Sequence, residues 1–89
     1  MNAAAIVSGS AFKDTNNNDI YHIIDAQLVK KVSGYKGQIK YTTIKENGEM
    51  KNSRQSIETF QTKLPTFIPI SKNELAERYE QVIQNSQDN

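Results

Sequence analysis

Few side chains in this 89-residue chain are of the types that carry out catalysis or bind metals. The chain has one histidine, His22, and no cysteine. A metal centre or a catalytic triad needs several groups close together, whereas Asp25, three residues after His22, falls on the opposite face of a predicted strand. We therefore expect a structural or surface role for His22 and no metal site.

Acidic residues beside predicted turns are the other candidates for acid or base catalysis. They are Asp14, Asp19, Glu46 and Glu49. A catalytic acid needs surroundings that shift its pKa, and nothing near these turns is visibly built to do so. Residues 34–37 contain two glycines but lack the length, spacing and following helix of a phosphate-binding loop. The sequence therefore predicts a protein that is not an enzyme and needs no cofactor.

Positive charge is concentrated in the middle of the chain. Residues 29–54 carry seven lysine and arginine residues against two acids, although the net charge of the whole chain is only +1. Residues 74–89 are acidic, with four acids against one arginine. This segregation predicts a basic contact surface within residues 29–54.

Tyrosines lie among these basic residues, and the combination suits two kinds of partner. Lysine and arginine contact phosphates while aromatic rings stack on bases, so the surface could bind single-stranded nucleic acid or RNA. Tyrosine and arginine also dominate protein interfaces, and an exposed edge strand can accept another chain. The candidate contact residues are Tyr35, Lys36, Lys40, Tyr41, Lys45, Lys51, Asn52 and Arg54.

The same residues have a structural alternative. In it, Tyr41 faces the core with Ile39, Arg54 covers the tyrosine ring by a cation–π contact, and the lysines protect an edge strand from aggregation. Because the isoelectric point is only 7.9, the charge is well below that of domains that bind duplex DNA non-specifically. We therefore expect a protein partner, with a second copy of the chain included, and keep nucleic acid as the alternative.

A hairpin is predicted to carry this surface. Asn47-Gly48 suits a two-residue type I′ turn, which pairs Glu46 with Glu49 and places Tyr41 opposite Arg54. The return segment, residues 51–56, contains no hydrophobic residue. It is therefore expected to be an exposed edge strand or a projecting ribbon, with a loop after Met50 as the other interpretation.

The elements before the hairpin are expected to be strands. Residues 4–13 are predicted as a strand and residues 14–19 as a loop. Residues 20–33 have the alternation of a half-buried strand, with a bend or bulge near residues 25–27 and a turn at residues 34–37. The predicted buried side chains of that strand are Ile20, Ile24, Ala26, Leu28 and Val32.

Helical signals dominate the segment after the hairpin. Ser56 can cap a short helical turn that ends at Pro65, and residues 66–70 suit an edge strand because of Pro69. Ser71 and Glu74 form a capping box that predicts a helix over residues 72–84, followed by a frayed tail at residues 85–89.

The expected fold is mainly β: a small twisted sheet or a partly open SH3-like or OB-like barrel with a C-terminal helix, in one domain over residues 1–84. A split α+β sheet is the alternative. The longest apolar run, residues 3–7, is too short for a membrane span or a signal peptide, so a soluble cytoplasmic protein is expected. Its expected function is that of a non-enzymatic binding module, either a protein-interaction domain or a small regulatory or inhibitory protein.

Overall fold

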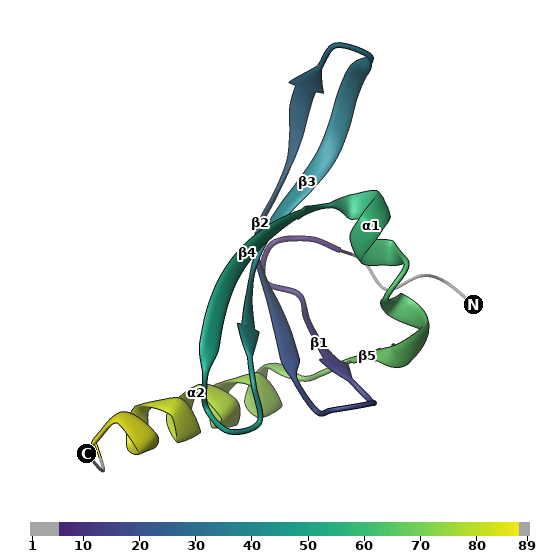
Figure 1. Cartoon of the computed structure of the whole chain (residues 1–89). Coiled ribbons are helices and arrows are strands. Elements are labelled where there is room, and N and C mark those ends of the chain that lie inside the picture. The colour runs from purple at the N-terminus through teal and green to yellow at the C-terminus, as the bar shows by residue number, and fades with distance from the viewer. Residues whose placement is uncertain (1–5, 88–89) are drawn as a thin grey trace.

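The fold is an open five-stranded antiparallel sheet with strand order β4-β3-β2-β1-β5 (Figure 1). The computed structural model describes residues 6–87, and residues 85–87 only by their backbone. The elements are β1 (Ala11–Asp14), β2 (Ile20–Lys31), β3 (Gly34–Ile44), β4 (Met50–Ser56), α1 (Ile57–Gln61), a 3-10 turn (Leu64–Thr66), β5 (Phe67–Pro69) and α2 (Lys72–Gln87). The mainly β fold with a C-terminal helix is thus confirmed, and the sheet does not close into a barrel.

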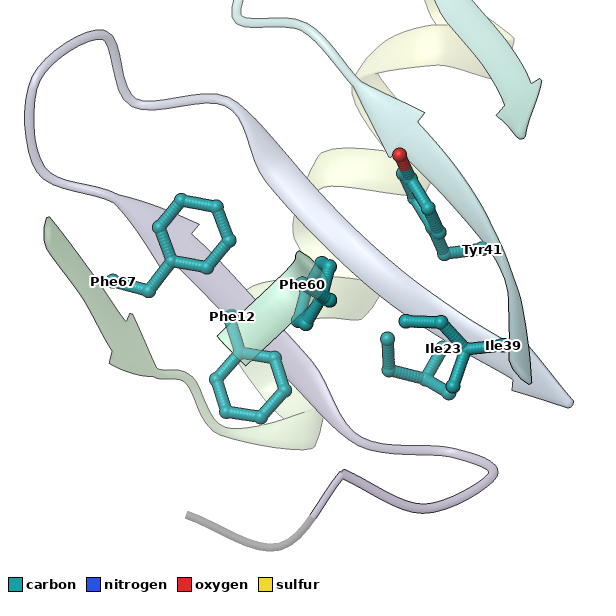
Figure 2. Packing of buried hydrophobic residues seen from close by; sticks show 6 residues of the cluster. All are labelled: Phe12, Ile23, Ile39, Tyr41, Phe60 and Phe67. Atoms are coloured by element: carbon teal, nitrogen blue, oxygen red, sulfur yellow. The ribbon is translucent and has the colours of Figure 1, made fainter. Parts of the chain in front are cut away.

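The main hydrophobic core lies between one face of the sheet and α1. Phe60 is the buried residue of α1, and its ring centroid lies 5.5 Å from that of Tyr41 and 5.6 Å from that of Phe67. Side chains from four strands surround it (Figure 2). The cluster consists of Phe12, Ile23, Ile39, Tyr41, Phe60 and Phe67.

Helix α2 packs on the opposite face of the sheet, near the start of β2 and the end of β3. The guanidinium of Arg78 donates to the backbone oxygens of Ile44 and Asn18, both at 2.9 Å. Ile20 and Ile44 are cross-strand partners and both are fully buried. The hydrogen bonds of Arg78 join the C-terminal helix to the end of β3 and to the loop before β2.

Beyond α1, β2 and β3 continue as a two-stranded hairpin that projects from the body (Figure 1). We call residues 27–38 the arm. A register shift between Ile23 and Asp25 marks a bulge at its base. The arm turns through Val32 and Ser33, which Gly34 follows with a φ of 119°.

The arm corrects two predictions. The turn is at residues 32–33, immediately before the residues where it was predicted. Those residues, 34–37, belong to β3. The predicted buried face of β2 is correct at Ile20 and in part at Ala26, which is half-buried against the core, but wrong elsewhere: Ile24, Leu28 and Val32 are exposed, whereas Ile23 is buried. The bulge lies just before the predicted bend and reverses which side chains of the strand face the core. Beyond it the arm projects from the body, so Leu28 is left uncovered.

The β3–β4 hairpin exists, but its register differs from the prediction by one residue. Its loop has three residues, because Lys45 N–H donates to the Glu49 oxygen at 2.8 Å and Gly48 has a φ of 92°. This is the geometry of a type I turn followed by a left-handed glycine, so Thr42 and not Thr43 lies opposite Asn52. A shift of one residue moves every side chain of β4 to the other face.

The helix caps and both edge strands agree with the sequence. Ser56 Oγ accepts from Thr59 N–H at 3.1 Å and Ser71 Oγ accepts from Glu74 N–H at 3.1 Å. Residues 50–56 form strand β4 rather than a loop, and β4 and β5 are the edges of the sheet.

The first and last elements differ in length from their predictions. β1 begins at Ala11 rather than at residue 4, and residues 4–5 lie outside the described residues. α2 extends three residues past its predicted end, and residues 88–89 are outside the described range. Over residues 6–87, no helix has the length and apolar character needed to cross a membrane.

Candidate binding surfaces

The arm presents apolar side chains directly to solvent. Leu28 is 72% exposed, Tyr35 is 67% exposed, and Val32 at the tip is fully exposed. The register places Leu28 opposite Gly37 and Lys30 opposite Tyr35, on the same side of the sheet as Ala26 and Ile39. Leu28 and Tyr35 thus continue the apolar face of the core into solvent.

The charge of the arm has one sign. It carries Lys30, Lys31 and Lys36 and no acid between Asp25 and Glu46. All three lysines are exposed, and the two strands place Lys30 on the apolar side and Lys31 and Lys36 on the other. A partner would therefore meet apolar side chains bordered by positive charge.

A second surface lies on the α2 side of the sheet. Lys40 and Arg54 are directly opposite each other on β3 and β4, and Thr42 and Asn52 form the next pair. Thr42 Oγ1 donates to Asn52 Oδ1 at 2.8 Å, a bond that does not use the N–H groups of the Asn52 side chain. These side chains and Ile24 line an open groove of about 530 Å³. We call it the β4 groove.

The predicted contact residues do not form one surface. Tyr35 and Lys36 lie on the arm, whereas Lys40, Asn52 and Arg54 come together in the β4 groove. The other three are separate. Lys45 flanks the hairpin loop with its Nζ 3.9 Å from Glu49 Oε2, Lys51 is exposed on the core side of β4, and Tyr41 is buried.

Tyr41 is the clearest correction. It is 7% exposed and packs against Tyr21 and Phe60, so it cannot offer its ring to a partner. Arg54 lies opposite Lys40 and on the other face of the sheet, so the predicted cross-strand pair and the cation–π cover are both wrong. The alternative in which Tyr41 faces the core with Ile39 is confirmed.

Sequence reasoning missed the apolar part of the arm. Leu28 and Val32 alternate with polar residues, as in a half-buried strand, and the pattern is the same whether or not another layer covers them. The one available signal was length: a strand of fourteen predicted residues, residues 20–33, is longer than a small body can cover.

His22 makes a structural contact with α2. Its Nδ1 lies 2.7 Å from the Tyr79 hydroxyl oxygen, which ties β2 to α2. Burial lowers the pKa of His22 and raises the pKa of Tyr79, so a neutral ring can accept from a protonated hydroxyl. Among the described residues, no three His, Cys, Asp or Glu side chains gather as a metal site would require.

The burial of His22 predicts a loss of stability in mild acid. The pKa of His22 is lower in the folded chain than in the unfolded one, so the unfolded chain binds the proton first as pH falls. The contribution of the neutral ring is complete above the unfolded pKa of about 6.5 and is lost as pH falls toward the folded pKa. Urea unfolding followed by circular dichroism at pH ~7.5 and ~5.5 should show this loss, and His22→Gln should reduce it. An equal loss in both proteins would assign it to other groups.

The fold and its surfaces define a small open-sheet protein with a helix on either face, a projecting hairpin and a basic groove beside one edge. Comparison with protein-family models, curated proteins and solved structures gives no match to this chain.

Proposed function

We propose that the protein is a non-enzymatic binding module that uses its arm to hold an acidic surface of another protein. The observation that carries the proposal is the exposure of Leu28, Val32 and Tyr35 on a hairpin that projects from the body. Exposed apolar side chains on a projecting two-stranded element are unfavourable in water unless a partner covers them. Their burial would supply most of the binding free energy.

The lysines of the arm indicate the chemistry of the partner. Lys30, Lys31 and Lys36 have no acid beside them in the arm, so an apolar pocket bordered by carboxylates would complement it. Rim charges of this kind increase the rate of association and make it sensitive to salt. A regulatory or inhibitory role, in which the arm occupies a site on its target, is consistent with this contact.

A protein partner is favoured over nucleic acid because of Tyr41. A single-strand binding surface combines a basic groove with a series of exposed aromatic rings. With Tyr41 buried, Tyr35 is the exposed ring of the basic region, and its neighbours on the same side are Leu28 and Lys30. Aliphatic side chains suit a protein pocket better than the faces of bases. The absence of cysteine fits a reducing compartment, and a cytoplasmic location is part of the proposal.

The test compares partner capture by two variants, in each of which three exposed apolar side chains are replaced by serine. Leu28→Ser, Val32→Ser and Tyr35→Ser are combined in the arm variant, and Val7→Ser, Ile68→Ser and Ile83→Ser in the control. Each immobilised protein is exposed to an extract of the cells that produce it, and bound proteins are quantified by mass spectrometry. We expect one or more proteins to be retained by the wild type and the control and lost from the arm variant.

Rebinding of a purified captured protein then separates the outcomes. The dissociation constant should rise about 100-fold or more in the arm variant, as for the loss of a group of hot-spot residues. Equal retention by both variants would refute the proposal. Tight, salt-sensitive binding of labelled RNA or DNA oligomers that depends on Lys30, Lys31 and Lys36 would assign the arm to nucleic acid instead.

A further inference from the structure

The two edges of the sheet are not equivalent. β5 is three residues long and contains Pro69, which has no backbone N–H to donate. β4 has seven residues and no proline, and its outer side has no neighbouring strand in the described part of the chain. Of the two edges, β4 is therefore the one that can accept a further strand.

The free backbone groups of β4 coincide with the groove. In an antiparallel ladder, residue pairs that hydrogen-bond to each other alternate with pairs that do not. Lys45 and Glu49 form a hydrogen-bonded pair at the start of the β3–β4 ladder. Counting from that pair, the N–H and C=O groups of Asn52 and Arg54 point away from β3. The side chains of the same two residues line the β4 groove. Backbone and side-chain donors are thus presented together.

The groove holds like charges side by side. Lys40 and Arg54 are direct cross-strand partners, an arrangement that is unfavourable without a counter-ion. Asp25 is the other cross-strand partner of Lys40, yet neither Lys40 nor Arg54 forms an ion pair with any described residue. A bound carboxylate would relieve this repulsion and could accept from the Arg54 guanidinium and the Asn52 amide.

We propose that an extended acidic segment of a partner protein adds to β4 as a sixth strand, with its carboxylates in the β4 groove. Strand addition supplies main-chain hydrogen bonds, and the groove selects acidic side chains on alternate residues of the segment. A second copy of this chain is a poorer occupant, because β4 carries Lys51 and Arg54 and no acid, so two β4 strands would bring like charges together. This edge contains none of the arm residues, so the inference does not depend on the proposed function of the arm.

A model peptide tests the proposal with the full chain. The probe is a peptide as long as β4 in which glutamate alternates with valine, titrated into isotopically labelled protein at low and physiological salt. We expect amide chemical-shift changes and slower hydrogen exchange at Asn52 and Arg54, with smaller changes in the arm. The same peptide with every backbone nitrogen methylated keeps its charges but cannot donate main-chain hydrogen bonds, and should not bind.

Two single substitutions on the same strand provide the matched comparison. Arg54→Gln removes a positive charge from the groove, and Lys51→Gln removes one from the opposite face of β4. The dissociation constant of the peptide should rise about fivefold or more with Arg54→Gln and less than about twofold with Lys51→Gln. The arm variant should bind the peptide as the wild type does, so a failure here is distinct from a failure of the arm.

Three results would overturn the inference. Equal binding of the methylated peptide would show a charge effect without strand addition. Equal binding of a lysine-valine peptide would remove the acidic preference. Concentration-dependent shifts of the β4 amides without peptide, together with a dimer by sedimentation, would make a second copy the occupant.

Discussion

Phe60→Ala should lower the free energy of unfolding by about 3–5 kcal/mol, the usual cost of removing a buried phenylalanine ring. Phe60 is fully buried and contacts the rings of Phe12, Tyr41 and Phe67. In a domain of this size, whose total stability is on the order of 5–10 kcal/mol, such a loss removes about a third or more of the free energy of unfolding. Urea unfolding followed by far-ultraviolet circular dichroism measures it.

Two further substitutions distinguish the contribution of the Phe60 ring to stability from that of the rest of α1. Phe60→Leu keeps most of the apolar volume and should cost clearly less than Phe60→Ala. Glu58→Ala changes an exposed residue of the same helix and should alter the free energy of unfolding by less than about 0.5 kcal/mol. If Phe60→Ala cost no more than Glu58→Ala, α1 would not be the cover of the core.

Removal of most of the arm should abolish partner binding while the body remains folded. The variant replaces residues 28–37 by Asn-Gly, so that Gln27 and Gln38 flank a two-residue turn. The deletion removes four cross-strand pairs, so Gln27 and Gln38 take the place of Lys31 and Gly34 beside the turn. Because the number of removed pairs is even, the alternation of hydrogen-bonded and non-hydrogen-bonded pairs in the ladder is preserved.

The expected stability change of this variant is small. The removed side chains are mostly exposed, and the notable lost contact is that of Ile57 with Gly37, where an added Cβ atom would lie 2.6 Å from Ile57 Cδ1. We expect a decrease of about 1–2 kcal/mol in the free energy of unfolding. A folded variant that still binds the captured partner would place the binding surface elsewhere on the body.

Local signals in the sequence predicted the helical part of the fold. Ser56 and Ser71 cap their helices because a side-chain oxygen can satisfy an N–H group three residues later, a requirement met within a few residues of chain. The polar sequence of β4 likewise predicted an edge strand, since a central strand needs at least one apolar face and residues 51–56 have none.

The register of the β3–β4 hairpin could not be obtained in the same way. Asn47-Gly48 suits both a two-residue loop and a three-residue loop with a left-handed glycine, and the two differ by one residue. A polar return strand gives no hydrophobic pattern to choose between them. The register decides both the burial of Tyr41 and the pairing of Lys40 with Arg54. It depends on packing against other parts of the chain, which the sequence of the hairpin does not encode.

The arm illustrates the limit of periodicity. Alternation in residues 20–33 predicts a strand with one apolar face, but whether that face is covered depends on α1, which lies more than twenty residues further along the chain. Ile57 packs at Gly37 and the cover ends there, so Leu28 and Tyr35 remain exposed. Exposed apolar residues of this kind become visible only once the layers of the fold are known.

The amide spectrum of the isotopically labelled chain, recorded with and without a purified captured partner, tests the central proposal most directly. If the arm is the binding surface, the largest chemical-shift changes will fall within residues 27–38, and the amides of α2 will change little. Changes centred on α2 with an unaltered arm would contradict the proposal.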